Sequence, residues 1–283
     1  MIRLSMHTDN WRTLSGSMDQ AVVAAKKFGL EYIEFGVVDG QDFIEGLGYS
    51  PAVSLDANPI RLKRYLDDNG LKVSQIDAGY PITGPMGATF GVRYMQRAIQ
   101  FAAAVGCPFV DTTDGASKPE GYTDEQVLAI TKESLRQILE WAEDYEVTVN
   151  IETHGPYTND PEILEQMLNF FDTERLGLNL DTGNTFIAGG NPAEFVQRFL
   201  GKLRYMHIKD VSESLAAALR GEETGIAMSE SPIGQGVNAE NISECIRLLK
   251  EADWDGVISV ECLGTDENLT ASIDWLREQI ATA

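Results

Sequence analysis

Residues 147–181, VTVNIETHGPYTNDPEILEQMLNFFDTERLGLNLD, predict a strand, a helix and a second strand in that order. The runs VTVNIE and LGLNLD are apolar and short enough for buried strands, and each ends in a carboxylate, Glu152 or Asp181. Between them, PEILEQMLNFF has the apolar spacing of an amphipathic helix and begins with proline. Parallel strands need such a crossover, so the stretch predicts one strand-helix unit of a parallel sheet.

The same alternation repeats about eight times along the 283 residues. It favours an α/β fold, a single (β/α)8 TIM barrel, with a doubly wound sheet as the structural alternative. No linker rich in Pro, Gly or Ser interrupts the alternation, so we expect one domain over residues 1–283. The predicted strands are 2–6, 32–37, 72–77, 108–113, 147–152, 176–181, 203–210 and 256–261, and the predicted helical segments include 17–30, 94–106, 124–145, 161–171, 238–252 and 269–280.

Composition excludes several classes of partner. The chain has 44 acidic and 22 basic side chains, a net charge of −22, so we expect no nucleic-acid partner, which would need a basic face. No apolar run approaches the roughly 18 residues of a membrane helix, and the N-terminus lacks the pattern of a signal peptide, so we expect no membrane association and a cytoplasmic location. The cysteines, Cys107, Cys245 and Cys262, lack metal-ligand spacing and are expected to be reduced core residues.

Polar side chains gather where the predicted strands end, which is where the active site of a barrel lies. The last four strands end in Glu152, Asp181, His207 and Glu261, and in a barrel these strands are neighbours. Three buried carboxylates without a cation would cost several kcal/mol per ion. An oxygen-rich site with one nitrogen and no thiolate therefore predicts a divalent metal ion, Mn²⁺ before Mg²⁺ or Co²⁺.

These four strand ends, together with the turn IGQGVNAENI (233–242), resemble the xylose isomerase-like barrel superfamily, which includes sugar isomerases, ketose 3-epimerases and inosose dehydratases. The resemblance covers essentially the whole chain. It implies that the four residues are metal ligands, that Glu152 and Glu261 are the catalytic carboxylates that bracket the substrate, and that the barrel forms a homo-oligomer. The implied activity in carbohydrate metabolism is isomerase or epimerase: a proton is removed next to the carbonyl of a neutral keto- or aldo-sugar, and an enediolate forms.

Two positions depart from the epimerase pattern. His154 follows Glu152 by two residues in ETHG, which places both on one face of an extended segment and predicts a second catalytic acid or base. Asn184 stands where the epimerases usually have His, and it can bind a substrate hydroxyl without exchanging a proton. These departures, with an insert at about 211–236, also resemble the catalytic subunits of C-glycoside deglycosidases. The alternative function is therefore a lyase that eliminates the aglycone from a 3-keto-glycoside, with a small partner subunit.

The remaining substrate-binding candidates are Lys209, His7 and Trp11. Alternation in HIKD puts Lys209 on the face of His207, where it contacts a substrate oxygen or forms an ion pair with Asp181 or Asp210 that only orients the site. His7 and Trp11 follow the first strand, and Trp11 is as consistent with core packing as with stacking on a sugar. A sugar-binding barrel without catalysis remains a further alternative. The sequence leaves open which sugar is bound, whether the enzyme is an epimerase, isomerase or lyase, which metal it holds and its oligomeric state.

Overall fold

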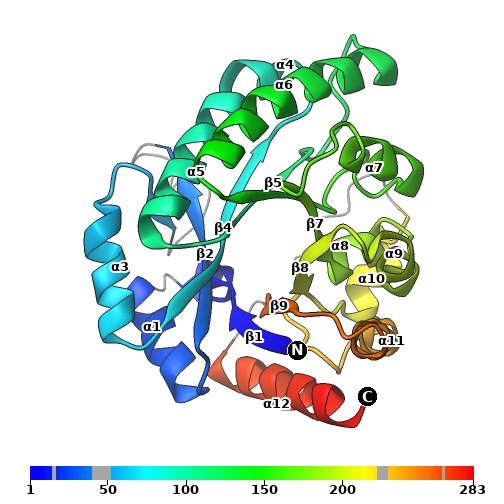
Figure 1. Cartoon of the computed structure of the whole chain (residues 1–283). Helices are drawn as coiled ribbons and strands as arrows, with labels where there is room; N and C mark the ends of the chain where they lie inside the picture. Colours follow the sequence, from blue (N-terminus) through cyan, green and yellow to red (C-terminus); the bar gives the residue numbers. More distant parts are fainter. Residues whose placement is uncertain (15–16, 40–51, 222–228, 263–264) are drawn as a thin grey trace.

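A closed ring of parallel strands surrounded by helices forms the protein (Figure 1). The structure, a computed structural model, describes residues 1–14, 17–39, 52–221, 229–262 and 265–283. The strands pair in the order β1-β9-β8-β7-β6-β5-β4-β2-β3, and a parallel bridge between His7 and Glu34 joins β1 to β2. The predicted α/β TIM barrel is therefore confirmed.

All eight predicted strands are present, with ends that differ from the prediction by a few residues. The largest differences are in β4, which runs on to Pro81, and in β3, a two-residue strand beside the end of β2 that was not predicted. The strand bounds are β1 Ile2–Met6, β2 Tyr32–Val38, β3 Val53–Ser54, β4 Lys72–Pro81, β5 Phe109–Thr113, β6 Thr148–Glu152, β7 Leu176–Asp181, β8 Leu203–Ile208 and β9 Gly256–Val260.

The predicted helical segments are also confirmed, and two further outer helices, α3 and α9, were missed. Both begin with an Asn cap followed by Pro, Asn58 for α3 and Asn191 for α9, which is a sequence signal for a helix start. Among the described residues, no helix has both the length and the apolarity needed to cross a membrane. The helix bounds are η1 Thr8–Leu14, α1 Met18–Lys27, α3 Pro59–Asp68, α4 Gly84–Met86, η2 Gly87–Gly91, α5 Val92–Val105, α6 Asp124–Asp144, α7 Pro161–Leu168, α8 Thr182–Ile187, α9 Pro192–Phe199, α10 Glu213–Leu219, α11 Ala239–Glu251 and α12 Asp266–Thr282.

The two faces of the ring have different chemistry. Outward-facing side chains such as Val149, Leu178 and Ile258 are buried in the apolar core between strands and helices. Inward-facing positions carry polar residues instead, and Asn150 and Asn179 are fully buried. Their amide N–H groups donate to Gln75 and Asp111, so the barrel interior contains a hydrogen-bonded layer rather than an apolar plug.

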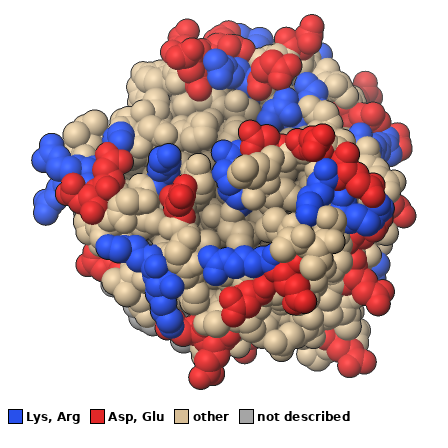
Figure 2. Space-filling view, turned by 60° about the horizontal axis from the view of Figure 1, so that its bottom comes forward, with Lys and Arg blue, Asp and Glu red and all other residues tan. Residues whose placement is uncertain are grey.

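Charged side chains on the surface are largely intermixed. The face in Figure 2 shows Lys and Arg interspersed with Asp and Glu rather than gathered in one basic patch. Two surface arginines pair with acids on the same helix, Arg136 with Glu133 and Arg247 with Glu244. Exposed pairs of this kind contribute little to stability, typically below about 1 kcal/mol.

Asp210, two residues after the end of β8, fixes the start and the end of the predicted insert. Its carboxylate accepts backbone hydrogen bonds from Val211 at 2.8 Å, Gly234 at 2.9 Å, Gly236 at 2.8 Å and Asn238 at 3.0 Å. A side chain at Gly236 would overlap this carboxylate, which explains the second glycine of the turn. Residues 222–228 of the insert lie outside the described residues, so its extent and the single-domain organisation stay predictions.

Replacement of Asp210 by Ala should lower the free energy of unfolding by about 3 kcal/mol, because several N–H groups lose a buried acceptor at once. Urea unfolding followed by circular dichroism measures the change. Asp67→Ala is the matched control, since Asp67 is exposed and pairs across the surface with Lys63. Equal stability of Asp210→Ala and Asp67→Ala would show that the hydrogen bonds to Asp210 do not stabilise the two ends of the insert.

Candidate metal centre

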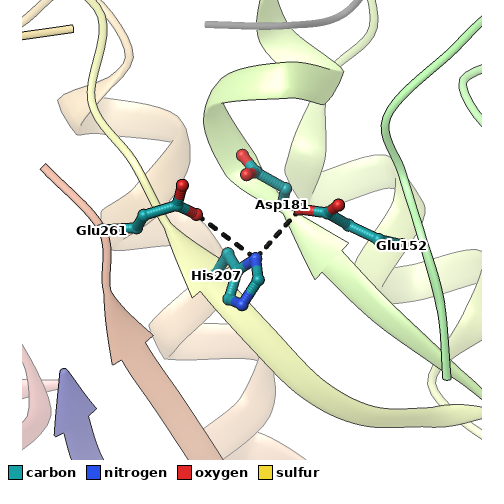
Figure 3. A group of neighbouring side chains, drawn as sticks. All are labelled: Glu152, Asp181, His207 and Glu261. Atoms are coloured by element: carbon teal, nitrogen blue, oxygen red, sulfur yellow. Dashed lines mark hydrogen bonds and ion pairs between the residues drawn. The ribbon is translucent and has the colours of Figure 1, made fainter. Parts of the chain in front are cut away.

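Four side chains meet at the carboxyl ends of the neighbouring strands β6, β7, β8 and β9 (Figure 3). Glu152, Asp181, His207 and Glu261 each offer one ligand atom, and these atoms all lie within 4.8 Å of one another. His207 Nδ1 lies 2.9 Å from Glu152 Oε1 and 3.3 Å from Glu261 Oε2. The parallel register places these side chains side by side, because Asp181 pairs with His207 across β7 and β8. The structure thus brings together all four predicted ligands; their role in binding a metal stays a prediction.

Lys209 compensates part of the negative charge. Its Nζ lies 2.9 Å from Asp181 Oδ2 and 3.0 Å from Glu261 Oε1. Burial opposes the charged ammonium, but Asp181 and Glu261 outweigh burial and raise the pKa of Lys209 above its usual value. Of the two ion pairs considered from the sequence, the structure contains the one with Asp181 and not one with Asp210. Contact between Lys209 and a substrate stays a prediction.

The donor set fits a divalent cation. Asp181 Oδ2 and Glu261 Oε2 are buried and accept no well-aligned hydrogen bond from the described residues. Asp181 Oδ2 forms an ion pair with Lys209, and Glu261 Oε2 lies within ion-pair distance of His207. Carboxylate oxygens with one imidazole nitrogen are the ligands that Mn²⁺ and Mg²⁺ accept, and zinc also binds such sets. Glu152, Asp181, His207 and Glu261 are therefore the residues that could hold the ion.

His154 lies in a loop after β6 that one buried carboxylate holds in place. Asp114 accepts hydrogen bonds from the backbone of Gly155 at 2.7 Å, Tyr157 at 2.7 Å and Thr158 at 3.1 Å. The Nδ1 atom of His154 is buried and has no hydrogen-bond partner among the described residues. A rigid loop with an unpaired ring nitrogen suits a group that exchanges a proton with a ligand. The role of Asp114 was not predicted, because it depends on bonds between loops 41 to 44 residues apart.

The other predicted substrate-binding residues occupy different places. His7 lies beside the centre, with its ring 5.6 Å from that of His207 and its Nε2 3.4 Å from Asp77 Oδ2. Asn184 is buried near the start of α8, where its backbone N–H donates to Asp181 Oδ1 at 2.9 Å. Trp11 is only 1% exposed and belongs to the apolar core, so the structure gives it a packing role, and stacking on a sugar stays a prediction.

Glu34 and Asp111 lie within predicted strands and were not predicted as site residues. Together with His207 they form a second cluster deeper in the barrel whose ligand atoms also lie within 4.8 Å of one another. Burial, followed by the charges of Asp77 and Glu152, raises the pKa of Asp111 well above its usual value. The sequence does contain a signal that could have indicated Glu34 as a site residue. It is a carboxylate inside the otherwise apolar strand YIEFGV.

A family model described as a xylose isomerase-like TIM barrel matches residues 22–279. The chain belongs to this family. Solved structures with the same fold align over nearly the whole chain. A D-tagatose 3-epimerase-like protein aligns with a TM-score of 0.75 and 21% identity over 99% of this chain and 97% of its own. The IOLI protein with a bound zinc atom aligns at 0.76 and 19% identity, over 99% and 98% of the two chains. The 3-keto-D-glucoside 4-epimerase YcjR of E. coli aligns at 0.71 and 14% identity, over 99% and 100%. At these identities the likeness shows the fold.

Curated relatives of this xylose isomerase-like barrel match over shorter lengths. The uncharacterized protein MJ1311 of Methanocaldococcus jannaschii is 29% identical over 140 residues, 48% of this chain and 44% of that protein. An inosose dehydratase of Clostridium botulinum (strain Eklund 17B / Type B) is 19% identical over 145 residues, 50% of this chain and 48% of the enzyme. The chain thus spans about half the length of the curated relatives it matches.

Replacement of Lys209 by Met should make the fold dependent on the metal. Without a metal ion, Asp181 and Glu261 remain buried and lose their ammonium partner, so the free energy of unfolding of the metal-free protein should fall by about 3–5 kcal/mol. Saturating Mn²⁺ should recover most of this loss. Urea unfolding in EDTA and in Mn²⁺ measures both states, with Lys63→Met at an exposed ion pair as control. An equal loss with and without Mn²⁺ would show that Lys209 and the metal do not share these carboxylates.

Proposed function

We propose that the protein is a divalent-metal-dependent sugar isomerase or epimerase that uses Mn²⁺. The observation that carries the proposal is the convergence of Glu152, Asp181, His207 and Glu261 at the end of the barrel where active sites of this fold lie. When bound there, a divalent cation would polarise the carbonyl of a sugar and make the neighbouring C–H bond more acidic. The kinship with epimerase structures supports the reaction class.

We assign the removal of that proton to Glu152. Burial is the main cause that raises the pKa of Glu152, and His207 opposes the shift only in part. An unprotonated carboxylate held beside the substrate carbon can accept its proton. As the C–H bond breaks, the proton goes to Glu152 and the electron pair moves to the carbonyl oxygen, which gives an enediolate.

The groups around Glu152 stabilise and complete this step. The ammonium of Lys209, 3.0 Å from Glu261, lies where it can offset the charge of the enediolate. Glu261 or His154 then returns a proton to the opposite face of the same carbon, which gives epimerisation, or to the neighbouring carbon, which gives isomerisation. His7 and Asn184 supply hydrogen bonds to hydroxyl groups. We propose a neutral sugar as substrate, because Lys209 already pairs with two carboxylates and a phosphate group would need a further cation.

A lyase remains the second candidate, and the fixed position of the loop at His154 favours it. After Glu152 takes the proton next to the keto group, the electron pair can expel a substituent from the next carbon. An acid must protonate the leaving group, and His154, whose Nδ1 has no hydrogen-bond partner among the described residues, can do so. The match to an inosose dehydratase supports elimination as a reaction class for this barrel.

Incubation of the Mn²⁺-loaded protein in deuterium oxide with neutral ketoses and with 3-keto-glycosides tests both candidates. Deuterium at the carbon next to the carbonyl of intact sugar, read by NMR and mass spectrometry, is expected for the isomerase or epimerase. Released aglycone would identify the lyase instead. No exchange and no release across the panel would contradict enolisation.

Glu152→Gln and His154→Asn should each reduce this exchange by about 100-fold or more, the usual contribution of a positioned acid or base. Metal content, measured by elemental analysis, should be retained in His154→Asn, which changes no ligand of the centre. Exchange that survives both substitutions would assign proton transfer to other residues.

A further inference from the structure

His207 is held from both of its ring nitrogens. Nδ1 faces the metal centre, whereas Nε2 lies 2.9 Å from Glu34 Oε1 on the opposite side of the ring. The ring edges are packed too, since Tyr205 lies 6.0 Å away at an interplanar angle of 88° and His7 packs at 74°. The imidazole therefore has one orientation, and Glu34 defines the side that points away from the centre.

Glu34 is itself fixed by donors that lie inside the barrel. Its side chain is fully buried. Oε1 also accepts a hydrogen bond from Gln75 at 3.0 Å, and Oε2 accepts one from the hydroxyl of Tyr205 at 3.1 Å. Ser74 in turn contacts the Tyr205 hydroxyl at 2.8 Å. The carboxylate thus has no freedom to turn away from His207.

Hydrogen bonds occupy much of the deeper cluster of Glu34, Asp111 and His207, although Asp111 Oδ1 has no hydrogen-bond partner among the described residues. Amide N–H groups point at its oxygens: Asn179 donates to Asp111 Oδ2 at 2.8 Å, and Gln75 donates to the same atom at 3.3 Å. A cation bound to this oxygen would face the positive ends of these N–H groups, which is unfavourable. Asn150 completes the chain by a donation to Gln75 Oε1 at 2.7 Å.

Resting on the proposed function, we propose that Glu34 is the positioning residue of the metal centre, which accepts the Nε2–H of His207 and presents an unprotonated Nδ1 to the metal. A neutral imidazole carries one N–H, and the hydrogen bond that this N–H makes decides which nitrogen is free to bind a cation. A carboxylate as acceptor also makes the free nitrogen a stronger ligand. Glu34 acts through His207 and does not touch the substrate.

The test is the affinity for Mn²⁺, measured by isothermal titration calorimetry on the metal-free full-length protein. Glu34→Gln keeps the shape of the side chain but removes its charge, and it should weaken binding by about 10- to 100-fold. Asp111→Asn is the matched control, because Asp111 is equally buried in the same layer and makes no hydrogen bond to His207 among those described. It should leave both the affinity and the stoichiometry of one ion unchanged.

The possible outcomes show which of the two proposals fails, the proposed function or the positioning role of Glu34. Wild-type protein that binds no Mn²⁺ overturns the proposed function, and the positioning role with it. Tight binding by wild type and by Glu34→Gln alike overturns the positioning role alone, and weaker binding by Asp111→Asn places the metal in the deeper cluster instead.

A second measurement does not depend on any variant. In the Zn²⁺-loaded wild-type protein, ¹⁵N NMR of the His207 ring should show a proton on Nε2 and none on Nδ1. A proton on Nδ1 would overturn the proposal even if Glu34→Gln fails to fold.

Discussion

Three carboxylates and one imidazole share a buried space at the end of the barrel, and their charge is the constraint on which the site depends. Bringing such ions out of water costs several kcal/mol each unless cations accompany them. In the chain itself, Lys209 and His207 provide this compensation. Burial disfavours a charged His207, but Glu34 and Glu152 outweigh burial and raise the pKa of His207 well above its usual value. A divalent ion would take over this role, and its binding would release the Nδ1 proton.

The alternation of side chains along the strands separates the two tasks of the barrel wall. Outward residues join the apolar core under the helices and provide stability. Inward residues form a polar layer beneath the metal centre. Glu34 belongs to this layer and contacts the centre through its hydrogen bond with His207. A change at Glu34 is therefore expected to alter metal binding rather than only stability.

The strand pattern and the polar strand ends could be predicted because they depend on local sequence alone. Apolar runs of five or six residues set the strands, and the parallel barrel then requires that Glu152, Asp181, His207 and Glu261 converge. The supporting residues could not be predicted in the same way. The register between β2 and β4 shifts between Ile33 and Phe35, so alternation alone does not show that Gln75 meets Glu34. The hold of Asp114 on the loop at His154 depends on the spacing of two loops, which no local pattern encodes.

Anomalous diffraction at the manganese edge, from crystals of the Mn²⁺-loaded protein, tests the central claim most directly. We expect one strong peak, surrounded by Glu152, Asp181, Glu261 and the Nδ1 of His207. The Nε2 atom of His207 should still be hydrogen-bonded to Glu34. A peak between Glu34 and Asp111, or no peak at the strand ends, would contradict the central claim.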